Sequence, residues 1–400
     1  MEYLFSGLKV VDAASFLAGP GAATVLADFG ADVIKVEPPG GDRYRTLAGN
    51  YAIDYNWLLT SRNKRSIGLD ITSAEGREVL QKLIIGADVL LVNFRADQLE
   101  RFELEYEKLQ ALNPRLIYAH MTGYGTEGEE ADRRAFDATA WWARSGLMDL
   151  VRDKGQAPVV GSPGFGDHSS AMSLFGAIVM GLYRREKTGE GSYVTTSLAA
   201  NGAWANGMQL QGVIAGFDLG RLRQEKGWLN PFSSVYGTSD GRFVIFAIID
   251  PVKEWKNLCV ALDRRDWITD ERFGDLRSMM KNRRELKAMM VDIIRKLTLH
   301  ELVSRLDEHD LTFGVVQQGP EVVADPQLIA IEIIVPTGSD DPLYQWTVAS
   351  PIKLKEAQKK PPSRAPEIGQ HSHEVLAELG YAEDEIGQLI AQGVVRQSDI

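Results

Sequence analysis

The chain has 400 residues, of which 44% are hydrophobic and 25% charged, a composition typical of a globular protein with two or three domains. Its formal charge of -11 argues against nucleic acid or an anionic membrane as partners. The single cysteine, Cys259, excludes an intramolecular disulfide and fits a reducing compartment. Because the N-terminal residues lack the features of a signal peptide and no apolar run is long enough to cross a bilayer, we expect a cytoplasmic protein.

The first half of the chain alternates short apolar runs, typical of buried strands, with helical patterns. This alternation predicts a doubly wound α/β sheet whose strands are parallel and joined by right-handed crossovers. Strands are expected at 8–14, 31–37, 65–71, 87–94 and 115–121, with an edge strand at 192–198. Helices are expected at 18–28, 73–85, 106–112, 136–148, 169–185 and around 201–211.

The periodicity fades between residues 212 and 234, which predicts a linker. A hairpin is expected at 235–248 around the turn Ser239-Asp-Gly241, followed by amphipathic helices from 253 to 309, and together they predict a smaller α+β domain over 235–330. After two strand-like stretches, the Lys/Pro-rich segment 353–366 is interpreted as a solvated connector, and two short helices follow His371.

One carboxylate stands out, because Asp167 lies between a glycine-rich loop and a strongly apolar helix. The absence of a polar face from 169 to 185 predicts a helix buried on all sides. At a helix start, unpaired N–H groups favour an ionised carboxylate and can bind developing negative charge. The alternative is that Asp167 simply caps the helix, and the residues alone do not decide between the two.

Three other patterns carry less weight. Gly19-x-Gly21-x-x-Thr24 lacks the third glycine of a dinucleotide fingerprint, which argues against a nicotinamide cofactor. Asp167-His168-Ser169 cannot form a triad, because consecutive residues of a helix point in different directions. The six histidines do not cluster with acids at ligand spacing apart from His371-Ser-His373, which reads as a helix start, so no metal is predicted.

Basic and amide residues recur where predicted sheet elements begin or end: Arg62-Asn-Lys-Arg65, Asn93-Phe-Arg95 and Arg133-Arg134. Each cluster alone reads as solvated surface charge. Three of them at element ends, where ligands of open α/β sheets bind, favour a phosphate-bearing ligand.

The ordered blocks Ala18-Gly-Pro20, Asp32-Val-Ile-Lys-Val-Glu-Pro-Pro-Gly40, Asn63-Lys-Arg-Ser-Ile67 and Pro366-Glu-Ile-Gly-Gln-His371 resemble the class III coenzyme A-transferases. The resemblance covers nearly the whole chain. It implies a large Rossmann-like domain shared by residues 1–211 and 331–400, and a homodimer whose chains thread through each other as linked rings. It also implies acyl-CoA and a carboxylic acid as substrates, without a tightly bound cofactor.

By the same resemblance, Asp167 aligns with the nucleophilic aspartate, which forms an acyl anhydride and then an aspartyl-CoA thioester. Phe16 and Leu17 are expected at the thioester end of the pocket. Residues at or near CoA-contacting positions are Lys64, Asn93, Phe94, Arg101 and Arg134. Gly164 and Gly166 are expected to supply N–H donors to the tetrahedral oxyanion.

Departures from the family pattern narrow the range of expected substrates. Leu17 replaces the glutamine of the formyl-CoA:oxalate branch, and the loop 225–234 lacks that branch's glycine run, which argues against oxalate. The phrases 136–146 and 166–168 are closer to members that handle aryl-propenoyl and 2-hydroxyacyl groups, with Trp141, Trp142 and Phe165 as candidate walls of an acyl pocket. The alternatives are an α-methylacyl-CoA racemase, a nicotinamide-linked oxidoreductase and a non-catalytic CoA-binding protein. The racemase is disfavoured, because its mechanism uses a histidine in the segment before Asp137 and this chain has none there.

Overall fold

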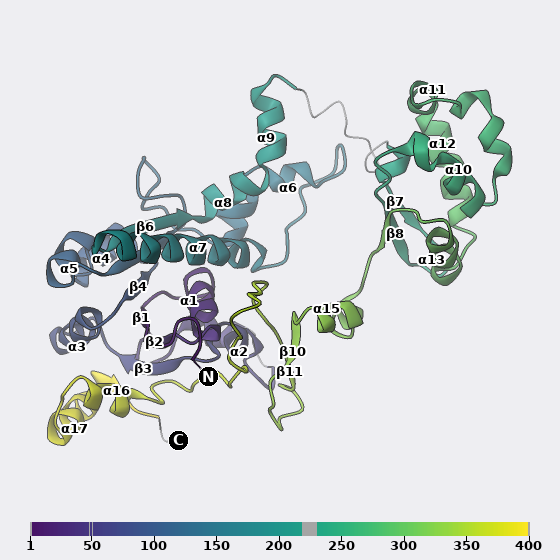
Figure 1. Cartoon of the computed structure of the whole chain (residues 1–400). Coiled ribbons are helices and arrows are strands. Elements are labelled where there is room, and N and C mark those ends of the chain that lie inside the picture. Colours follow the sequence, from purple (N-terminus) through teal and green to yellow (C-terminus); the bar gives the residue numbers. More distant parts are fainter. Residues whose placement is uncertain (1, 48, 50, 218–229, 399–400) are drawn as a thin grey trace. The chain divides into compact units, whose positions relative to one another are not determined.

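The computed structural model describes residues 2–47, 49, 51–217 and 230–398. The chain divides into two compact units, Met1–Asp149, Val160–Gly207 and Pro326–Ile400 forming the large unit, and Leu150–Val159 and Met208–Asp325 forming the small unit (Figure 1). Most of the expected linker, residues 218–229, lies outside the described residues. Its described ends belong to helix α9 (Gly207–Ile214) and to a short 3-10 turn, Pro231–Ser233.

The large unit is built on a seven-stranded sheet with the order β12-β3-β2-β1-β4-β5-β6. All neighbours pair in parallel except β12, which runs antiparallel to β3. The expected parallel α/β sheet is confirmed, and the antiparallel strand from the end of the chain makes it mixed. The strands are β1 Lys9–Asp12, β2 Asp32–Glu37, β3 Arg65–Leu69, β4 Val89–Val92, β5 Ile117–Thr122, β6 Ser192–Ser197 and β12 Val395–Arg396.

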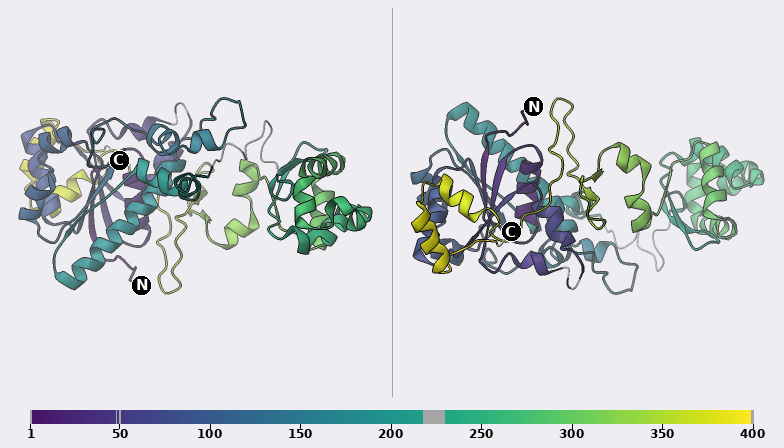
Figure 2. Two further views of the ribbon diagram at one scale, coloured as in Figure 1. Left: turned by 90° about the horizontal axis from the view of Figure 1, so that it is seen from above. Right: turned by 90° about the horizontal axis from the view of Figure 1, so that it is seen from below.

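Helices cover both faces of this sheet because its strands are apolar on both sides. One face packs against α3 (Ala74–Ile85), α5 (Tyr106–Leu112), α16 (Ser372–Glu378) and α17 (Glu383–Ala391), and the other packs against α1 (Ala18–Asp28) and α7 (Phe165–Thr188). The C-terminal helices, yellow in Figure 2, thus share a core with the N-terminal strands. The remaining helices of the large unit are α2 Tyr55–Ser61, α4 Ala96–Arg101, α8 Leu198–Ala205 and α15 Pro326–Ala330, and α6 Leu147–Leu150 ends in the small unit.

Helix α7 departs from the expectation of burial on all sides. Ala171, Leu174 and Ile178 are buried against the sheet and α1, but Met180 and Tyr183 are 73% and 65% exposed. Trp204 on the neighbouring α8 is 85% exposed. The apolar composition of α7 therefore reflects one face packed in the core and a second apolar face that is open in the single chain.

The segment 353–366 is also different from a solvated connector, because its backbone is tied to the large unit. The Lys360 N–H donates to the Asp28 carbonyl at 2.7 Å, and the Pro366 carbonyl accepts from Trp57 Nε1 at 3.0 Å. Before it, the expected strand-like stretches form an antiparallel pair, β10 (Ile334–Pro336) with β11 (Trp346–Val348).

The small unit contains an antiparallel sheet, β7 (Val235–Gly237), β8 (Phe243–Phe246) and β9 (Phe313–Val315), which confirms the expected hairpin. Its core of apolar side chains lies between this sheet and the helices, which are α10 Pro251–Ala261, α11 Leu276–Lys281, α12 Arg283–Ile294 and α13 Leu299–Glu308, with α14 Gly319–Val323 following. Among the described residues of both units, no helix is long and apolar enough to span a membrane.

Candidate active site

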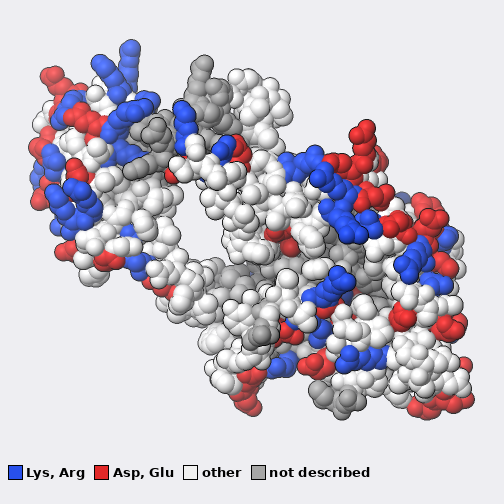
Figure 3. All heavy atoms as spheres, turned by 180° about the vertical axis from the view of Figure 1, so that it is seen from behind, with Lys and Arg blue, Asp and Glu red and all other residues white. Residues whose placement is uncertain are grey.

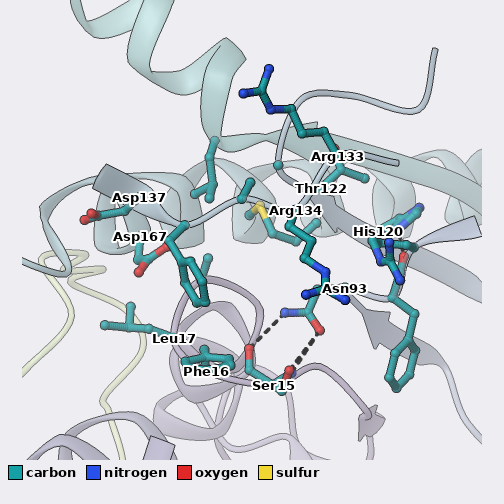
Figure 4. A pocket seen from close by; sticks show the side chains of 18 of the residues that line it. Ser15, Phe16, Leu17, Asn93, His120, Thr122, Arg133, Arg134, Asp137 and Asp167 are labelled. Carbon is teal, nitrogen blue, oxygen red and sulfur yellow. Dashed lines mark hydrogen bonds between the residues drawn. The ribbon is translucent and has the colours of Figure 1, made fainter. Parts of the chain in front are cut away.

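The site begins where the strand order reverses. Strands β1 and β4 are neighbours in the centre of the sheet, and in open α/β sheets ligands bind beyond the carboxyl ends of two such strands. Asn93, just after β4, accepts the Ser15 backbone N–H through Oδ1 at 3.0 Å and donates from Nδ2 to the Ser15 carbonyl at 2.9 Å. These reciprocal bonds hold the two strand ends together at the floor of the site (Figure 4).

A cleft of about 1760 Å³ opens above this point, within the large unit. It exceeds the roughly 300–1,000 Å³ that holds drug-sized ligands, so it has room for a nucleotide portion and an acyl group together. Its walls come from the loops that follow β1, β2, β4 and β5, from the turn before α7, and from residues of β5 and β6.

Asp167 lies in the first turn of α7 and lines the cleft. The N-cap is Gly164, whose φ of 96° is in the left-handed region that favours glycine, so Asp167 is the third residue of the helix and not its cap. Burial, with a contribution from the Asp137 charge, raises the pKa of Asp167 to about 7. The cleft thus holds a carboxylate that ionises near neutral pH and is not engaged in capping.

Asp137 fixes the start of α7. Its Oδ2 accepts the backbone N–H groups of Gly164 at 2.8 Å and Gly166 at 3.2 Å, and the residue is 5% exposed. These are the two N–H groups expected to face an oxyanion, and their engagement by Asp137 means that they are not free to do so. The expected helix over 136–148 is a π-helical segment, η2 (Asp137–Ala143), followed by α6, which places Asp137 at the first position of its segment.

The wall opposite includes a strained residue. Phe16 has φ of 63°, unusual for a residue with a side chain, and Asp42 Oδ1 accepts its N–H at 3.4 Å. Asp42 is itself paired with the fully buried Lys35 at 3.4 Å. The Phe16 ring packs edge-to-face on Phe136 with centroids 5.5 Å apart and on Tyr44 at 6.4 Å. These rings form an aromatic wall of the cleft, of which only Phe16 was expected from the sequence.

Six of the eight expected site residues line the cleft: Phe16, Leu17, Asn93, Phe94, Arg134 and Asp167. Leu17 packs near the start of α7, since a Cβ added at Gly164 would lie 3.4 Å from its Cδ1. Arg134 is exposed and has no ion pair or hydrogen bond of its side chain within the described part of the chain, so its charge is available to an anion.

The other two, Lys64 and Arg101, do not line the cleft. Lys64 is fully buried, and its Nζ pairs with Asp12 Oδ2 at 2.9 Å and donates to the Pro20 carbonyl at 2.8 Å. Its charge is therefore used inside the protein, where it joins β3 to β1 and α1. Arg101, at the end of α4, is exposed with its guanidinium over the Phe102 ring.

The candidate acyl-pocket residues Trp141, Trp142 and Phe165 do not line the cleft either. Trp141 belongs to the core between the sheet and α7, and a Cβ added at Gly166 would lie 2.5 Å from its Cγ. The tryptophans therefore support the turn that carries Asp167. His168 is exposed and outside the lining, in keeping with its rejection as a triad member.

Two further features of the protein are its surface charge and its potential metal-binding groups. On the face seen in Figure 3, Lys and Arg side chains are interspersed with Asp and Glu. Within the described residues, no group of three His, Cys, Asp or Glu side chains is placed to hold a metal ion.

Fold and site together define an α/β protein with a large cleft at the switch point of its sheet and, lining that cleft, a carboxylate of raised pKa. Residues 5–372 match CoA-transferase family III, and the chain belongs to this family. It is a class III CoA-transferase, an enzyme that moves coenzyme A between an acyl-CoA and a carboxylic acid. This membership sets aside the nicotinamide-linked oxidoreductase and the non-catalytic binding protein.

The chain is similar to characterised members along its whole length. It is 31% identical over 399 residues to the (R)-2-hydroxy-4-methylpentanoate CoA-transferase of Clostridioides difficile, covering 98% of this chain and 100% of that one. It is 32% identical over 406 residues to the cinnamoyl-CoA:phenyllactate CoA-transferase of Clostridium sporogenes, covering 96% of both. A crystal structure of a CAIB/BAIF family protein from Brucella suis superimposes with a TM-score of 0.84 at 29% identity, covering 95% of this chain and 100% of that one.

Proposed function

We propose that Asp167 is the nucleophile of the transfer reaction and that the acyl groups are 2-hydroxyacyl or aryl-propenoyl groups. The observation that carries the first part is the position of Asp167, a carboxylate lining the cleft at the start of α7 with its pKa raised to about 7. A carboxylate with such a pKa is still ionised above neutral pH and is more basic, hence more nucleophilic, than an exposed aspartate.

The reaction proceeds in balanced steps. An Asp167 carboxylate oxygen attacks the acyl carbon, the C–S bond breaks, and CoA leaves as thiolate, which gives a mixed anhydride. The thiolate attacks the Asp167 carbonyl and releases the donor acid, leaving an aspartyl-CoA thioester. The acceptor carboxylate then attacks that carbonyl, and the thiolate, expelled again, takes the new acyl group and regenerates Asp167. The energy of the thioester is kept throughout, because no water enters.

Arg134, Asn93 and Phe94 are proposed to contact CoA. Arg134 is a cation without an internal partner in the cleft, suited to phosphate. Asn93 and Phe94 lie at the switch point, where nucleotide ligands of such sheets bind. Lys64 and Arg101 receive less support, because neither lines the cleft.

The acyl class is supported by the aromatic wall of Phe16, Tyr44 and Phe136, whose rings suit an apolar or aryl group. It is supported also by the names of the two relatives, although these share only 31% and 32% identity with the chain. Leu17, which lines the cleft next to Phe16, offers no polar group to a second carboxylate.

The test of the nucleophile is covalent trapping. Hydroxylamine added during turnover with an acyl-CoA should convert Asp167 to a hydroxamate, found by mass spectrometry in its peptide. Asp167→Ala should lose both label and exchange, and Asp266→Asn, at an exposed carboxylate of the small unit, should lose neither. Full exchange by Asp167→Ala, or a label elsewhere, would contradict the proposal.

The substrate class is tested by incubating the enzyme with cinnamoyl-CoA or a 2-hydroxyacyl-CoA and a panel of acids, and scanning for new CoA esters. We expect aryl and branched 2-hydroxy acids to exchange at least tenfold faster than succinate or oxalate. Faster exchange of the dicarboxylates would overturn the assignment. Deuterium entering the α-carbon of recovered acyl-CoA in D2O, without exchange of acids, would instead favour the racemase.

We propose further that two chains form an interlocked homodimer. The support is the exposed apolar face of Met180 and Tyr183 on α7 and Trp204 on α8, since such patches mark interfaces. Light scattering should give a mass of about 88 kDa, twice the 44.2 kDa of one chain. A monomer that retains activity would contradict this.

A cytoplasmic location is also proposed. Cys259 is buried, and burial raises the pKa of its thiol to about 12, so the thiol stays protonated and no disulfide is required for the fold. Cell fractionation followed by immunoblotting tests this, and recovery in a secreted fraction would contradict it.

A further inference from the structure

The acyl end of the cleft poses a question about hydrogen-bond donors. Attack by a carboxylate on a thioester places negative charge on the acyl oxygen, and enzymes stabilise this charge with donors fixed in advance. The N–H groups of Gly164 and Gly166, which lie close to Asp167 in the sequence, are both taken by Asp137. Other donors of the cleft are therefore candidates to meet the acyl oxygen.

Tyr44 has the properties of such a donor. It lies in the short 3-10 turn Arg43–Thr46, lines the cleft, and is 5% exposed. Its hydroxyl has no hydrogen-bond partner among the residues that the structure describes. Burial, and next the negative charge of Asp167, raise the pKa of the phenol, so at neutral pH the hydroxyl keeps its proton and remains a donor within the field of the nucleophile.

The position of Tyr44 is fixed from two sides. Asp42 Oδ1 accepts its backbone N–H at 2.9 Å, and the same oxygen accepts the Phe16 N–H at 3.4 Å. Its ring packs edge-to-face on Phe16, with centroids 6.4 Å apart. A donor held by backbone and ring contacts does not have to reorganise as the reaction proceeds, which is what makes such a group effective.

Several other hydroxyl groups of the cleft are already engaged. Tyr118 donates to the Leu104 carbonyl at 2.7 Å, and the Tyr193 hydroxyl bonds His120 Nδ1 at 2.8 Å. Ser15 Oγ is within 3.5 Å of Asn93 Oδ1. The first-turn N–H groups of α1, near Ala18, are further donors. A side-chain substitution at Tyr44 leaves those amides intact and can therefore separate the two sources.

We propose that the Tyr44 hydroxyl donates a hydrogen bond to the acyl oxygen that becomes an oxyanion when Asp167 attacks the thioester. This rests on the proposed role of Asp167. In the step, the new bond joins Asp167 Oδ to the acyl carbon and the carbonyl electron pair moves onto the acyl oxygen. The hydroxyl of Tyr44 keeps its proton throughout. When the carbonyl re-forms, the C–S bond breaks and CoA leaves as thiolate.

The experiment is single-turnover acylation of Asp167 in Tyr44→Phe, which removes the hydroxyl and keeps the ring. Hydroxylamine quench and mass spectrometry give the rate of label formation at Asp167. We expect a decrease of about 10²- to 10³-fold, the usual effect of removing one oxyanion donor. Binding of CoA, measured by calorimetry, and the melting temperature should stay close to wild type. Tyr381→Phe, remote from the cleft lining, controls for the loss of a tyrosine hydroxyl elsewhere.

Several outcomes would overturn the proposal. An acylation rate within threefold of wild type would assign the oxyanion to other donors of the cleft. An unchanged acylation rate with a raised KM for the acceptor acid would make Tyr44 a binding group for that acid. Failure of the underlying mechanism has a different signature, because wild type itself would then give no label at Asp167. If the melting temperature of Tyr44→Phe is lowered, Tyr44→Met supplies a second variant without the hydroxyl. An acylation rate equal to that of wild type in either variant would contradict the proposed role of Tyr44.

Discussion

Asp137 Oδ2 accepts the backbone N–H of Gly164 at 2.8 Å, so a carboxylate 27 residues earlier in the chain determines where α7 begins. Its charge also contributes to the raised pKa of Asp167, after burial. One side chain thus has a structural and an electrostatic effect on the proposed nucleophile, and two substitutions can separate them.

Asp137→Asn keeps an acceptor oxygen but removes the charge, so the pKa of Asp167 should fall and the acidic limb of the kcat/KM profile should move to lower pH. Because burial is the larger cause, the limb should stay well above the 3.8 of an ordinary aspartate. Asp137→Ala leaves two buried N–H groups without an acceptor and should cost about 1–3 kcal/mol of stability for each. Unfolding and pH-rate profiles check both; identical behaviour of the two variants would refute the separation.

The pKa of Asp167 has opposite consequences for activity and stability. Activity should be lost as pH falls through about 7, because the nucleophile becomes protonated. In the folded protein this pKa is raised, so the folded state holds the proton more tightly than the unfolded one, and stability declines as pH rises from about 4 to 7. Asp167→Asn should therefore be more stable than wild type at pH 8, by at most roughly 4 kcal/mol since Asp167 is partly exposed, and equally stable near pH 4. Denaturant melts at the two pH values measure this.

Gly166→Ala tests the close packing beneath the nucleophile. The new Cβ would lie 2.5 Å from Trp141 Cγ, which requires the first turn of α7 to shift. We expect kcat to fall at least tenfold. Gly387→Ala, on α17, meets nothing within 4 Å and should leave kcat unchanged while stabilising its helix by up to about 1 kcal/mol. Equal kcat for the two variants would show that the turn tolerates displacement.

Arg134→Ala should weaken CoA binding by about tenfold or more, the loss of a charge-assisted contact to phosphate. Arg101→Ala, outside the lining of the cleft, should have a smaller effect. Titration calorimetry with CoA and with dephospho-CoA measures the affinity of each variant. A larger effect at Arg101 would mean that CoA extends along α4 past Leu99, beyond the lining of the cleft.

Lys64→Met should destabilise the protein by about 3–5 kcal/mol, because it leaves the Asp12 charge buried without a partner. The double variant Asp12→Asn/Lys64→Met should recover most of this loss. Its affinity for CoA should stay within threefold of wild type, since Lys64 is enclosed between Asp12 and Pro20. A large loss of CoA affinity in a stably folded double variant would restore Lys64 as a contact residue.

The sheet could be predicted because its strands are short apolar runs that alternate with helical patterns. Five expected strands match β1 to β5 within a few residues. The short strand β12, with only Val395 and Arg396, carries no such signal. The position of helix α7 could also be predicted. The exposure of Met180 could not, since composition does not distinguish a core face from an interface.

The candidate site could be predicted only in part. Asp167, Asn93 and Arg134 follow recognisable elements, whereas the contact of Asp137 with Gly164 depends on the approach of two loops. Tyr44 lies in a turn with no periodic pattern. The burial of Lys64 did have a signal, because Asp12 is an acid at the end of an otherwise apolar strand and needs a buried cation.

The pairing of β12 with β3 has a consequence for biosynthesis. Residues 395–396 leave the ribosome after the small unit, so the hydrogen-bonding edge of β3 stays open while the whole small unit is being made. Open sheet edges are sites of mispairing. The large unit therefore completes its sheet only after the small unit has been made, and its folding from nascent chains should depend on chaperones more than that of a domain whose strands emerge consecutively.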